Sequence, residues 1–243
     1  MQRLGFTRSA HRADHLLLTP DTFVRAPLPG MTNAAAIVHA APALGASFTQ
    51  YTAEFEPGGR LGPASGQRFV YVLEGVVNAA GRTLAADDYC YLPTGASSEV
   101  VAQGKARASV IERAYQPLAG RAEPAMFSGS ERAVAPKPLL DDDAIEVRCL
   151  LPDDFAFDFA VNTMTYQPGA VLPMVEIHVM EHGLVMLSGG GIYRLGNCWY
   201  PVTEGDFIWM GPYCPQWFGA LGKVPAKYLI YKDWNRHPAG PAV

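Results

Sequence analysis

Charged residues are scarce in this sequence, and long apolar runs are absent. Only 17% of the 243 residues are charged, the formal net charge is −4, and Lys and Arg are scattered without a cluster. Proteins that bind nucleic acids usually have surfaces on which Lys and Arg are clustered, so a nucleic-acid partner is not expected here. The N-terminal residues contain one short apolar run, at positions 16–18, which predicts neither an export signal nor a membrane span. We therefore expect a cytoplasmic protein without a membrane partner.

Paired cysteines are lacking as well. The four cysteines, Cys90, Cys149, Cys198 and Cys214, are far apart in the sequence and form no CxxC motif. A chain of 243 residues can bury sizeable cores without disulfide bonds, so these side chains are expected to be reduced thiols.

Helical periodicity is hard to find, whereas short β-rich runs bounded by Gly, Pro, Asn and Asp recur along the chain. These runs are FVYVLEG, DYCYLPTG, TMTYQPG, GLVMLSG, GIYRLG, DFIWMGP and KYLIYKDW. Short strands separated by turn residues are typical of sandwiches and barrels. The sequence therefore predicts an all-β fold.

The two halves of the chain match one another when they are aligned on their turns. The matching segments are Glu56-Pro57-Gly58 with Gln167-Pro168-Gly169, Leu73-Glu74-Gly75 with Leu187-Ser188-Gly189, and Asp88-Tyr89-Cys90-Tyr91 with Asp206-Phe207-Ile208-Trp209. Their separations are 111, 114 and 118 residues, a drift of a few loop residues. We predict a duplicated β-barrel module, with an N-terminal extension and the first barrel in residues 1–130 and the second barrel in 131–243. Residues 120–144, rich in small residues, Pro and charge, are interpreted as the connector.

Two histidines and one carboxylate stand at even spacing in an apolar part of the second half. In an extended strand, Glu176, His178 and His182 would project from the same face. On the inside of a barrel, unpaired polar groups cost on the order of several kcal/mol, which a bound divalent cation would offset. The alternative is an ordinary half-buried strand with surface or hydrogen-bonded histidines. With the neutral Gln216 further along the chain, the group indicates a metal site.

These residues resemble the two motifs of the cupin superfamily, whose small β-barrels hold a metal in the barrel mouth. The first motif is Gly, five residues, His-x-His, three or four residues, Glu, six residues, Gly. Here Gly169 is followed by Glu176-x-His178, then His182, then Gly189, so the first His and the Glu have exchanged places.

The second cupin motif departs from the common pattern at its last ligand. It usually runs Gly, five residues, Pro-x-Gly, two residues, His. This chain has Gly205, then Gly-Pro-Tyr at 211–213, then Gln216 in place of the histidine.

With these departures the chain resembles the (S)-ureidoglycine aminohydrolase family, manganese bicupins of purine and allantoin degradation. The likeness extends over EIHVMEHGLVMLSGGGIYRLGNCWYPVTEGDFIWMGPYCPQWFGALG, YLIYKDWNR, LLLTPDTFVRAPLPG and LGASFTQY, and so covers nearly the whole chain. The resemblance implies a bicupin of two tandem jelly-roll-like barrels that hydrolyses (S)-ureidoglycine to (S)-ureidoglycolate and ammonia. It also implies a homo-oligomer, dimeric or higher.

The four ligands implied by the resemblance are Glu176, His178, His182 and Gln216, and their chemistry suits Mn²⁺. Oxygen and imidazole donors without thiolate fit a six-coordinate ion with two positions left open, and zinc fits less well. A single carboxylate leaves the site with net positive charge, which favours an anionic substrate such as an α-amino carboxylate.

The family resemblance also places Tyr193, Tyr228 and Lys232 against the substrate, with Tyr228 and Lys232 as catalytic residues. From the sequence alone, the two tyrosines could equally be barrel-wall aromatics. A buried Lys232 would need an anionic partner, which a substrate carboxylate or ureido oxygen would provide. The general acid or base is not evident from the sequence. His237, close to the end of the chain, is expected to be solvated.

The first barrel is expected to lack the metal site. Arg68 stands at the position equivalent to His182, and no histidine occurs between His39 and His178. We interpret this barrel as a structural and dimerising module.

Two other functions remain open at this point. One is a metal-dependent bicupin oxidoreductase or decarboxylase, against which Gln216 counts, because such enzymes normally keep three histidines and one glutamate. The other is a metal-poor bicupin that serves as a binding module.

Overall fold

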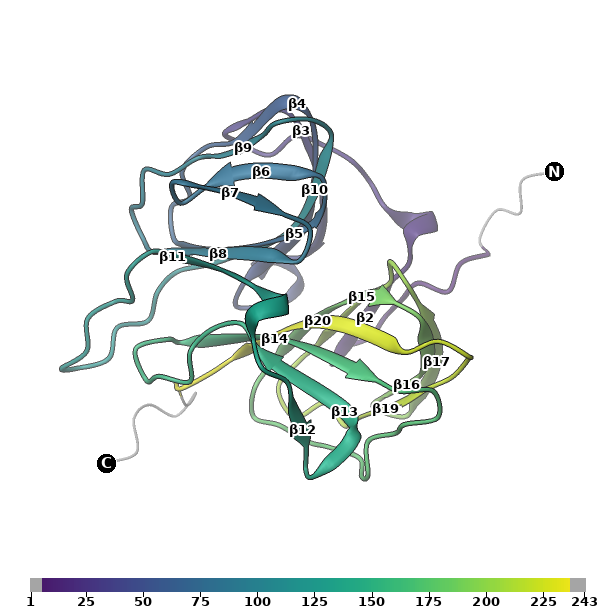
Figure 1. The fold of residues 1–243 in the computed structure, drawn as a ribbon. Coiled ribbons are helices and arrows are strands. Elements are labelled where there is room, and N and C mark those ends of the chain that lie inside the picture. Colours follow the sequence, from purple (N-terminus) through teal and green to yellow (C-terminus); the bar gives the residue numbers. More distant parts are fainter. Residues whose placement is uncertain (1–5, 237–243) are drawn as a thin grey trace. The chain divides into compact units, whose positions relative to one another are not determined.

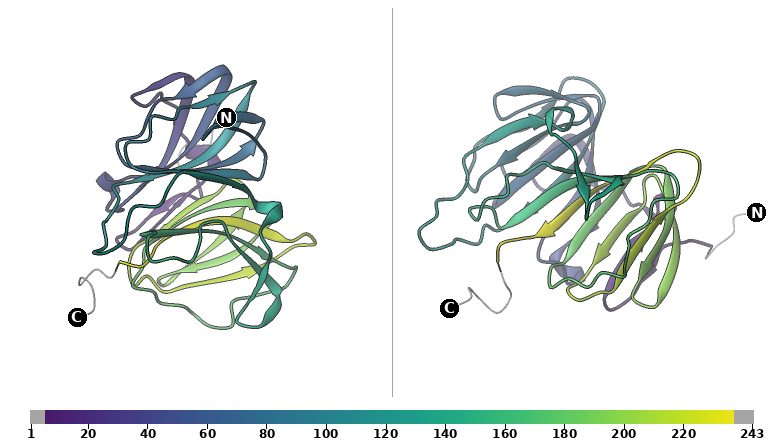
Figure 2. Two further views of the ribbon diagram at one scale, coloured as in Figure 1. Left: turned by 60° about the vertical axis from the view of Figure 1, so that its left-hand side comes forward. Right: turned by 60° about the horizontal axis from the view of Figure 1, so that its bottom comes forward.

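The computed structural model describes residues 6–236, and in that range it consists of strands, turns and three short 3-10 helices (Figures 1 and 2). The 3-10 helices are Pro20–Thr22, Pro42–Leu44 and Glu131–Ala133. The predicted all-β class is confirmed. Within the described range, no helix has the length and apolar character needed to cross a membrane. His237 lies outside the described residues.

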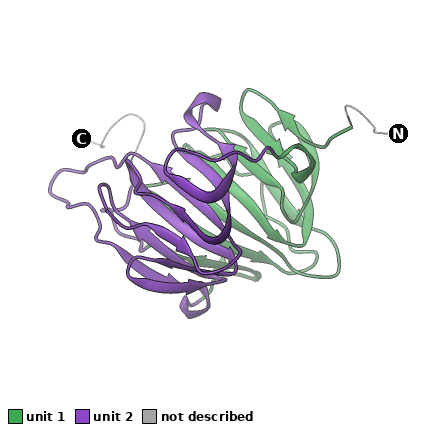
Figure 3. Ribbon diagram, turned by 90° about the horizontal axis from the view of Figure 1, so that it is seen from above, with its two compact units in different colours: residues 1–23, 136–151, 159–243 green, residues 24–135, 152–158 purple. Residues whose placement is uncertain are grey.

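The chain divides into two compact units (Figure 3). Unit 1 contains residues 1–23, 136–151 and 159–243, and unit 2 contains residues 24–135 and 152–158.

Unit 1 contains an eight-stranded and a three-stranded sheet. The order in the larger sheet is β1-β2-β18-β15-β20-β14-β13-β12, and that in the smaller is β17-β16-β19. Its strands are β1 (Ala10–His11), β2 (His15–Leu18), β12 (Lys137–Leu139), β13 (Asp142–Cys149), β14 (Phe159–Tyr166), β15 (His182–Ser188), β16 (Gly190–Leu195), β17 (Cys198–Thr203), β18 (Phe207–Met210), β19 (Gln216–Ala220) and β20 (Ala226–Asp233).

Unit 2 contains a nine-stranded sheet. Its order is β11-β8-β5-β10-β4-β9-β6-β7, and β3 pairs with β4. The strands are β3 (Met31–Ala40), β4 (Thr49–Leu61), β5 (Gln67–Glu74), β6 (Val76–Ala79), β7 (Arg82–Ala85), β8 (Asp88–Leu92), β9 (Val100–Ala102), β10 (Ala106–Arg113) and β11 (Phe127–Ser130).

The two units share one strand order, which confirms the duplication. The run β18-β15-β20-β14 in unit 1 has its counterpart in β8-β5-β10-β4 in unit 2. The matched turns have a steric reason at Gly75 and Gly189, where φ is 79° and 65°. A Cβ at Gly75 would lie 2.4 Å from a backbone carbonyl oxygen, and one at Gly189 would lie 2.5 Å from another. Only glycine is accommodated at either turn.

Residues 15–18 lie in the N-terminal extension that we assigned to the first half of the chain, but they complete the second barrel. They form β2, which pairs with β18 from Leu18 opposite Phe207 to His15 opposite Met210. An unpaired edge of β18 would expose backbone groups, and the short apolar run supplies the missing strand. In unit 2 the strand β11 pairs with β8 in the corresponding position.

The segment at residues 120–144, interpreted as the connector, contains the point where the chain passes from unit 2 to unit 1, between residues 135 and 136. It also contains β11, the 3-10 helix Glu131–Ala133, β12 and the start of β13. Its Pro and Gly residues therefore separate short edge strands.

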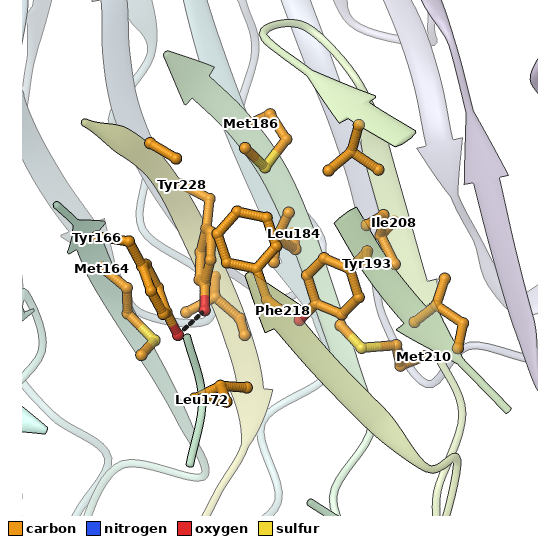
Figure 4. Close-up of a cluster of buried hydrophobic side chains, with 14 of the residues drawn as sticks. Met164, Tyr166, Leu172, Leu184, Met186, Tyr193, Ile208, Met210, Phe218 and Tyr228 are labelled. Carbon is orange, nitrogen blue, oxygen red and sulfur yellow. Dashed lines mark hydrogen bonds between the residues drawn. The ribbon is translucent and has the colours of Figure 1, made fainter. Parts of the chain in front are cut away.

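Aromatic and aliphatic side chains fill the interior of unit 1 (Figure 4). Leu184, Ile208 and Phe218 come from three different strands and are fully buried. Tyr166 and Tyr228 lie in the same cluster, and their hydroxyl oxygens are 2.9 Å apart. This core forms the floor beneath the candidate site.

Candidate metal centre

The segment that carries the first two candidate ligands is a loop, not the extended strand that we predicted for residues 176–182. Strand β15 begins only at His182. Glu176 forms an isolated bridge with Gln216, in which the two backbone N–H groups donate over 2.8 and 2.9 Å. The carbonyl of His178 accepts a hydrogen bond from the backbone N–H of Tyr213 at 2.7 Å. Backbone hydrogen bonds to the turn before β19 and to its first residue therefore hold this loop in place. The side chains of the loop do not follow the alternation of an extended strand.

The structure nevertheless brings the four predicted ligands together. Nε2 of His178 lies 3.2 Å from Oε2 of Glu176, and the rings of His178 and His182 have centroids 5.3 Å apart. The backbone bridge joins Glu176 to Gln216. His182 and Gln216 are buried, whereas Glu176 and His178 are partly exposed. The arrangement is a half-open cluster of two imidazoles, one carboxylate and one amide.

His182 is held in the form that a metal ligand requires. Its Nδ1–H donates to the carbonyl oxygen of Glu181 over 2.7 Å, which leaves the Nε2 lone pair available. Burial lowers the pKa of His182 to about 3, and the positive charge of Lys232 acts in the same direction. The imidazole is therefore neutral near pH 7, as metal coordination requires.

A bound ion would need a small rearrangement of these side chains. Among residues 6–236, three ligand atoms of His, Cys, Asp or Glu side chains lie within 4.8 Å of one another only at Asp14, His15 and Cys214. His178 and Glu176 contact each other directly, so their side chains would turn toward an ion shared with His182. The donor set itself, mixed oxygen and nitrogen without sulfur, fits Mn²⁺.

Two of the expected substrate residues lie on the inner wall of unit 1. The hydroxyl of Tyr193 donates to Oε1 of Gln216 over 3.4 Å, which links the wall to the fourth candidate ligand. Tyr228 lies on β20 beside Met186 of β15, and its hydroxyl meets that of Tyr166 (Figure 4). Burial raises the pKa of both Tyr193 and Tyr228 well above the usual value, so both hydroxyls stay protonated.

Lys232 lies directly beside His182. The two residues are cross-strand partners on β20 and β15. Burial lowers the pKa of Lys232, while the carboxylate of Glu176 opposes that shift. Within the described part of the chain, no ion pair involves the Lys232 ammonium, although it is more than half buried. A partly buried cation without an ion pair is suited to receive an anion.

Sequence reasoning missed Tyr166, whose hydroxyl partners that of Tyr228. It lies at the end of β14, just before the turn at Gly169. The alternating run TMTY placed a tyrosine on one face of a strand, but nothing local indicated that this face meets Tyr228.

Unit 2 has an internally neutralised pair at the equivalent positions. Arg68 and Glu112 are cross-strand partners on β5 and β10, as His182 and Lys232 are on β15 and β20. Nε of Arg68 lies 2.7 Å from Oε1 of Glu112, which also accepts a hydrogen bond from the hydroxyl of Tyr51 at 2.8 Å. In this barrel the positive charge of Arg68 is therefore neutralised by Glu112, without a bound ligand.

Comparisons with known proteins agree with this geometry. The cupin domain model matches residues 162–231, which include all four candidate ligands. The (S)-ureidoglycine aminohydrolase of Arabidopsis thaliana is 40% identical over 243 residues, covering 96% of this chain and 80% of that protein. This chain belongs to the (S)-ureidoglycine aminohydrolase family.

Further members of the family support this placement. The (S)-ureidoglycine aminohydrolase of Escherichia coli (strain K12) is 35% identical over 231 residues, covering 90% of this chain and 88% of that protein. The crystal structure of protein Ylba from E. coli aligns with a TM-score of 0.83 and 32% identity over 95% of both chains. The predicted cupin fold and the predicted resemblance to the aminohydrolase family are confirmed.

Proposed function

We propose that this chain hydrolyses (S)-ureidoglycine to (S)-ureidoglycolate and ammonia in a metal-dependent reaction. The observation that carries the proposal is the convergence in one unit of Glu176, His178, His182 and Gln216, with the cationic Lys232 beside them. The names of the related proteins and the high coverage of their chains support ureidoglycine as the substrate.

Glu176, His178, His182 and Gln216 would hold the ion, which we propose to be Mn²⁺. When bound, such an ion supplies positive charge and open coordination positions for the amine and carboxylate of the substrate.

Lys232 holds the anionic end of the substrate in this proposal. Its ammonium is more than half buried without an ion pair, next to His182. A carboxylate at this position would be stabilised by a charge-assisted hydrogen bond. Binding one end of the substrate at Lys232 and the other near the metal ligands would select one enantiomer.

In this proposal Tyr228 and Tyr193 orient the ureido end of the substrate. Their buried rings also exclude water from the floor of the site. Both hydroxyls stay protonated, so each can donate a hydrogen bond to the ureido oxygen. The Tyr166 hydroxyl sets the direction of the Tyr228 hydroxyl. The buried ring of Phe218, which contacts both Tyr193 and Tyr228, closes the floor to solvent.

Assembly and the role of the first barrel belong to the same proposal. The resemblance to the family supports a homo-oligomer of two or more chains. The scattered cysteines support a location in the cytoplasm. The neutralised pair of Arg68 and Glu112 supports a structural role for the first barrel.

A coupled assay tests the activity. The unstable substrate is generated from allantoate by an allantoate-degrading amidohydrolase in the presence of this protein. Enantiopure (S)-ureidoglycolate and ammonia are the expected products, whereas racemic product at the spontaneous rate would refute the proposal. Purified protein that retains less than about 0.2 metal ions per chain after growth and dialysis with Mn²⁺ would favour a binding module instead.

Two lysines on β20 provide a matched pair of variants. Lys232→Gln removes the proposed carboxylate partner and is expected to lower kcat/KM by about 100-fold, because a charge-assisted contact is lost. Lys227→Gln removes a charge from the opposite face of the same strand and is expected to keep near wild-type activity. Equal activity of the two variants would contradict the role of Lys232.

A further inference from the structure

A second group of metal-ligating side chains lies in unit 1 away from the four candidate ligands. Asp14 and His15 come from the turn between β1 and β2 and the start of β2, and Cys214 comes from the turn before β19. Their ligand atoms all lie within 4.8 Å of one another. His15 and Cys214 are buried, and Asp14 is partly exposed.

This group is separate from the candidate active site, although the two lie on one sheet. In the row that crosses β2, β18 and β15, Met210 stands between His15 and His182. The thioether of Met210 is buried in the hydrophobic core. None of the four candidate ligands of the first site is shared.

The ligand atoms are already oriented by hydrogen bonds. Nδ1 of His15 lies 2.8 Å from Oδ1 of Asp14, and Nε2 lies 2.9 Å from the hydroxyl oxygen of Tyr200. The ligand atoms of Cys214 and Asp14 lie within 4.8 Å of each other, and the Cys214 thiol donates to the carbonyl oxygen of Pro215 over 3.7 Å.

Gly196 lies beside this group. A Cβ at position 196 would lie 3.0 Å from Oδ2 of Asp14 and 3.8 Å from Cε1 of His15. The glycine therefore avoids a tight contact with the Asp14 carboxylate.

We propose that Asp14, His15 and Cys214 bind a divalent cation of the zinc class, with Nδ1 of His15 as the imidazole ligand. A thiolate selects zinc over manganese, magnesium or calcium, and three protein ligands with one open position are a known zinc arrangement. The cation has charge +2, and the thiolate and carboxylate contribute −1 each, so the buried site has no net charge.

Asp14 and His15 need to move little to admit the ion. Zinc bound at about 2.0–2.1 Å from nitrogen and oxygen places those two atoms about 3.3 Å apart. The present separation of 2.8 Å would open by about half an ångström. Asp14 can supply this movement because its side chain is 46% exposed. The imidazole proton moves from Nδ1 to Nε2 and donates to Tyr200, and only the thiol proton is released.

The ion would tie the N-terminal strand to the active-site turn. Asp14 and His15 lead into β2, the edge strand contributed by the beginning of the chain. Cys214 lies two residues before Gln216, the fourth candidate ligand of the first site. Binding would therefore stabilise the β2–β18 pairing and the backbone on which Gln216 depends.

Cobalt titration of the metal-free, full-length protein distinguishes the two sites. A thiolate bound to Co²⁺ gives a sulfur-to-metal charge-transfer band in the near ultraviolet, and the oxygen and nitrogen ligands of the first site cannot produce it. We expect one such band that saturates at one cobalt per chain and is bleached by Zn²⁺. Absence of the band in the wild-type protein would overturn the proposal.

Matched variants show which site gives the charge-transfer band. Cys214→Ser should abolish it, whereas Cys198→Ser, which removes another thiol of unit 1, should retain it. His182→Gln, which removes a ligand of the first site, should retain it as well. A band that survives in Cys214→Ser, or that disappears in His182→Gln while that variant is folded, would overturn the assignment.

Two measurements remain decisive if Cys214→Ser fails to fold. Asp14→Asn changes a partly exposed side chain, and it should weaken cobalt binding at the charge-transfer site at least tenfold; unchanged affinity would count against the proposal. X-ray absorption of wild-type protein carrying one equivalent of zinc should show one sulfur in the first coordination shell. A shell of nitrogen and oxygen alone would refute it.

Discussion

At the scale of single residues, the candidate site of unit 1 departs from a common barrel motif. Glu176 and His182 have exchanged the positions usual for cupins, and Gln216 replaces a histidine. The hydroxyl of Tyr193 donates to Oε1 of Gln216, so the amide has a specific partner that an imidazole would not reproduce.

The first prediction concerns this amide. If Gln216 is the fourth ligand of the proposed site, Gln216→His should retain Mn²⁺, because imidazole is also a good ligand, but lose the contact with Tyr193. We expect kcat to fall about 10-fold or more, the usual effect of disturbing the partners of a metal ligand. Elemental analysis and the coupled assay measure the two quantities. Unchanged turnover would show that the identity of the fourth ligand does not matter.

A second prediction concerns the pair in the first barrel, Arg68 and Glu112. Glu112→Gln leaves the buried Arg68 guanidinium without its countercharge, and we expect a loss of about 3 kcal/mol in the free energy of unfolding. The double variant Arg68→Met with Glu112→Leu should recover most of that loss, because it removes both charges. Urea denaturation gives the values, and additive losses in the double variant would contradict the idea of a neutralising pair.

At the scale of elements, the edge strands determine how each barrel is completed. The strand β2, from the beginning of the chain, pairs with β18, and β11 pairs with β8. The two edges are capped in equivalent positions by segments that come from different places in the sequence. Leu17 is fully buried in the core of unit 1, so the capping strand also contributes to the core beneath the site.

The third prediction tests that contribution. Leu17→Ala removes a fully buried side chain and should cost about 2–5 kcal/mol in the free energy of unfolding. Leu44→Ala, at a leucine that is 41% exposed in unit 2, is the matched control and should cost little. Thermal or urea unfolding compares the two. A similar small loss in both variants would mean that β2 is not required for the stability of the barrel.

At the scale of the whole molecule, buried neutral histidines make stability depend on pH. His39 in β3 is almost completely buried, its Nε2 lies 2.8 Å from the hydroxyl of Thr52, and burial lowers its pKa to about 3. The positive charge of Arg107 acts in the same direction. The unfolded chain binds a proton at this histidine below pH of about 6.5, while the folded chain does not. The contribution of His39 to the free energy of unfolding is therefore fully present above pH of about 6.5 and is lost as the pH falls toward 3.

The fourth prediction follows from this loss of stability at low pH. Between pH 7.5 and pH 5, His39 should account for a loss of about 2 kcal/mol in the free energy of unfolding. His39→Gln keeps an acceptor for Thr52 but cannot titrate, so its stability should fall less over the same range. His11→Gln, at an exposed histidine, should behave as the wild type does. Denaturant unfolding at both pH values measures the difference, and parallel curves for wild type and His39→Gln would refute it.

The sequence by itself determined the fold class, the duplication and the candidate ligand set. These features are local: turn glycines, β-rich runs and the spacing of Glu176, His178 and His182 can all be recognised within short windows. The duplication could be recognised because the same short turn motifs occur in both halves of the chain. The backbone conformation of residues 176–181 could not be obtained in this way, because their hydrogen bonds reach across to the turn before β19.

Only the tertiary structure decided which distant segments meet. The pairing of β2 with β18 and the hydrogen bond between His15 and Tyr200 join residues far apart in sequence, 185 positions apart in the second case. The same holds for the Tyr166–Tyr228 hydroxyl pair and for the group of Asp14, His15 and Cys214. Local propensity determines whether a segment becomes a strand, but the choice of partner depends on the burial and backbone pairing of the whole barrel, which no short window contains.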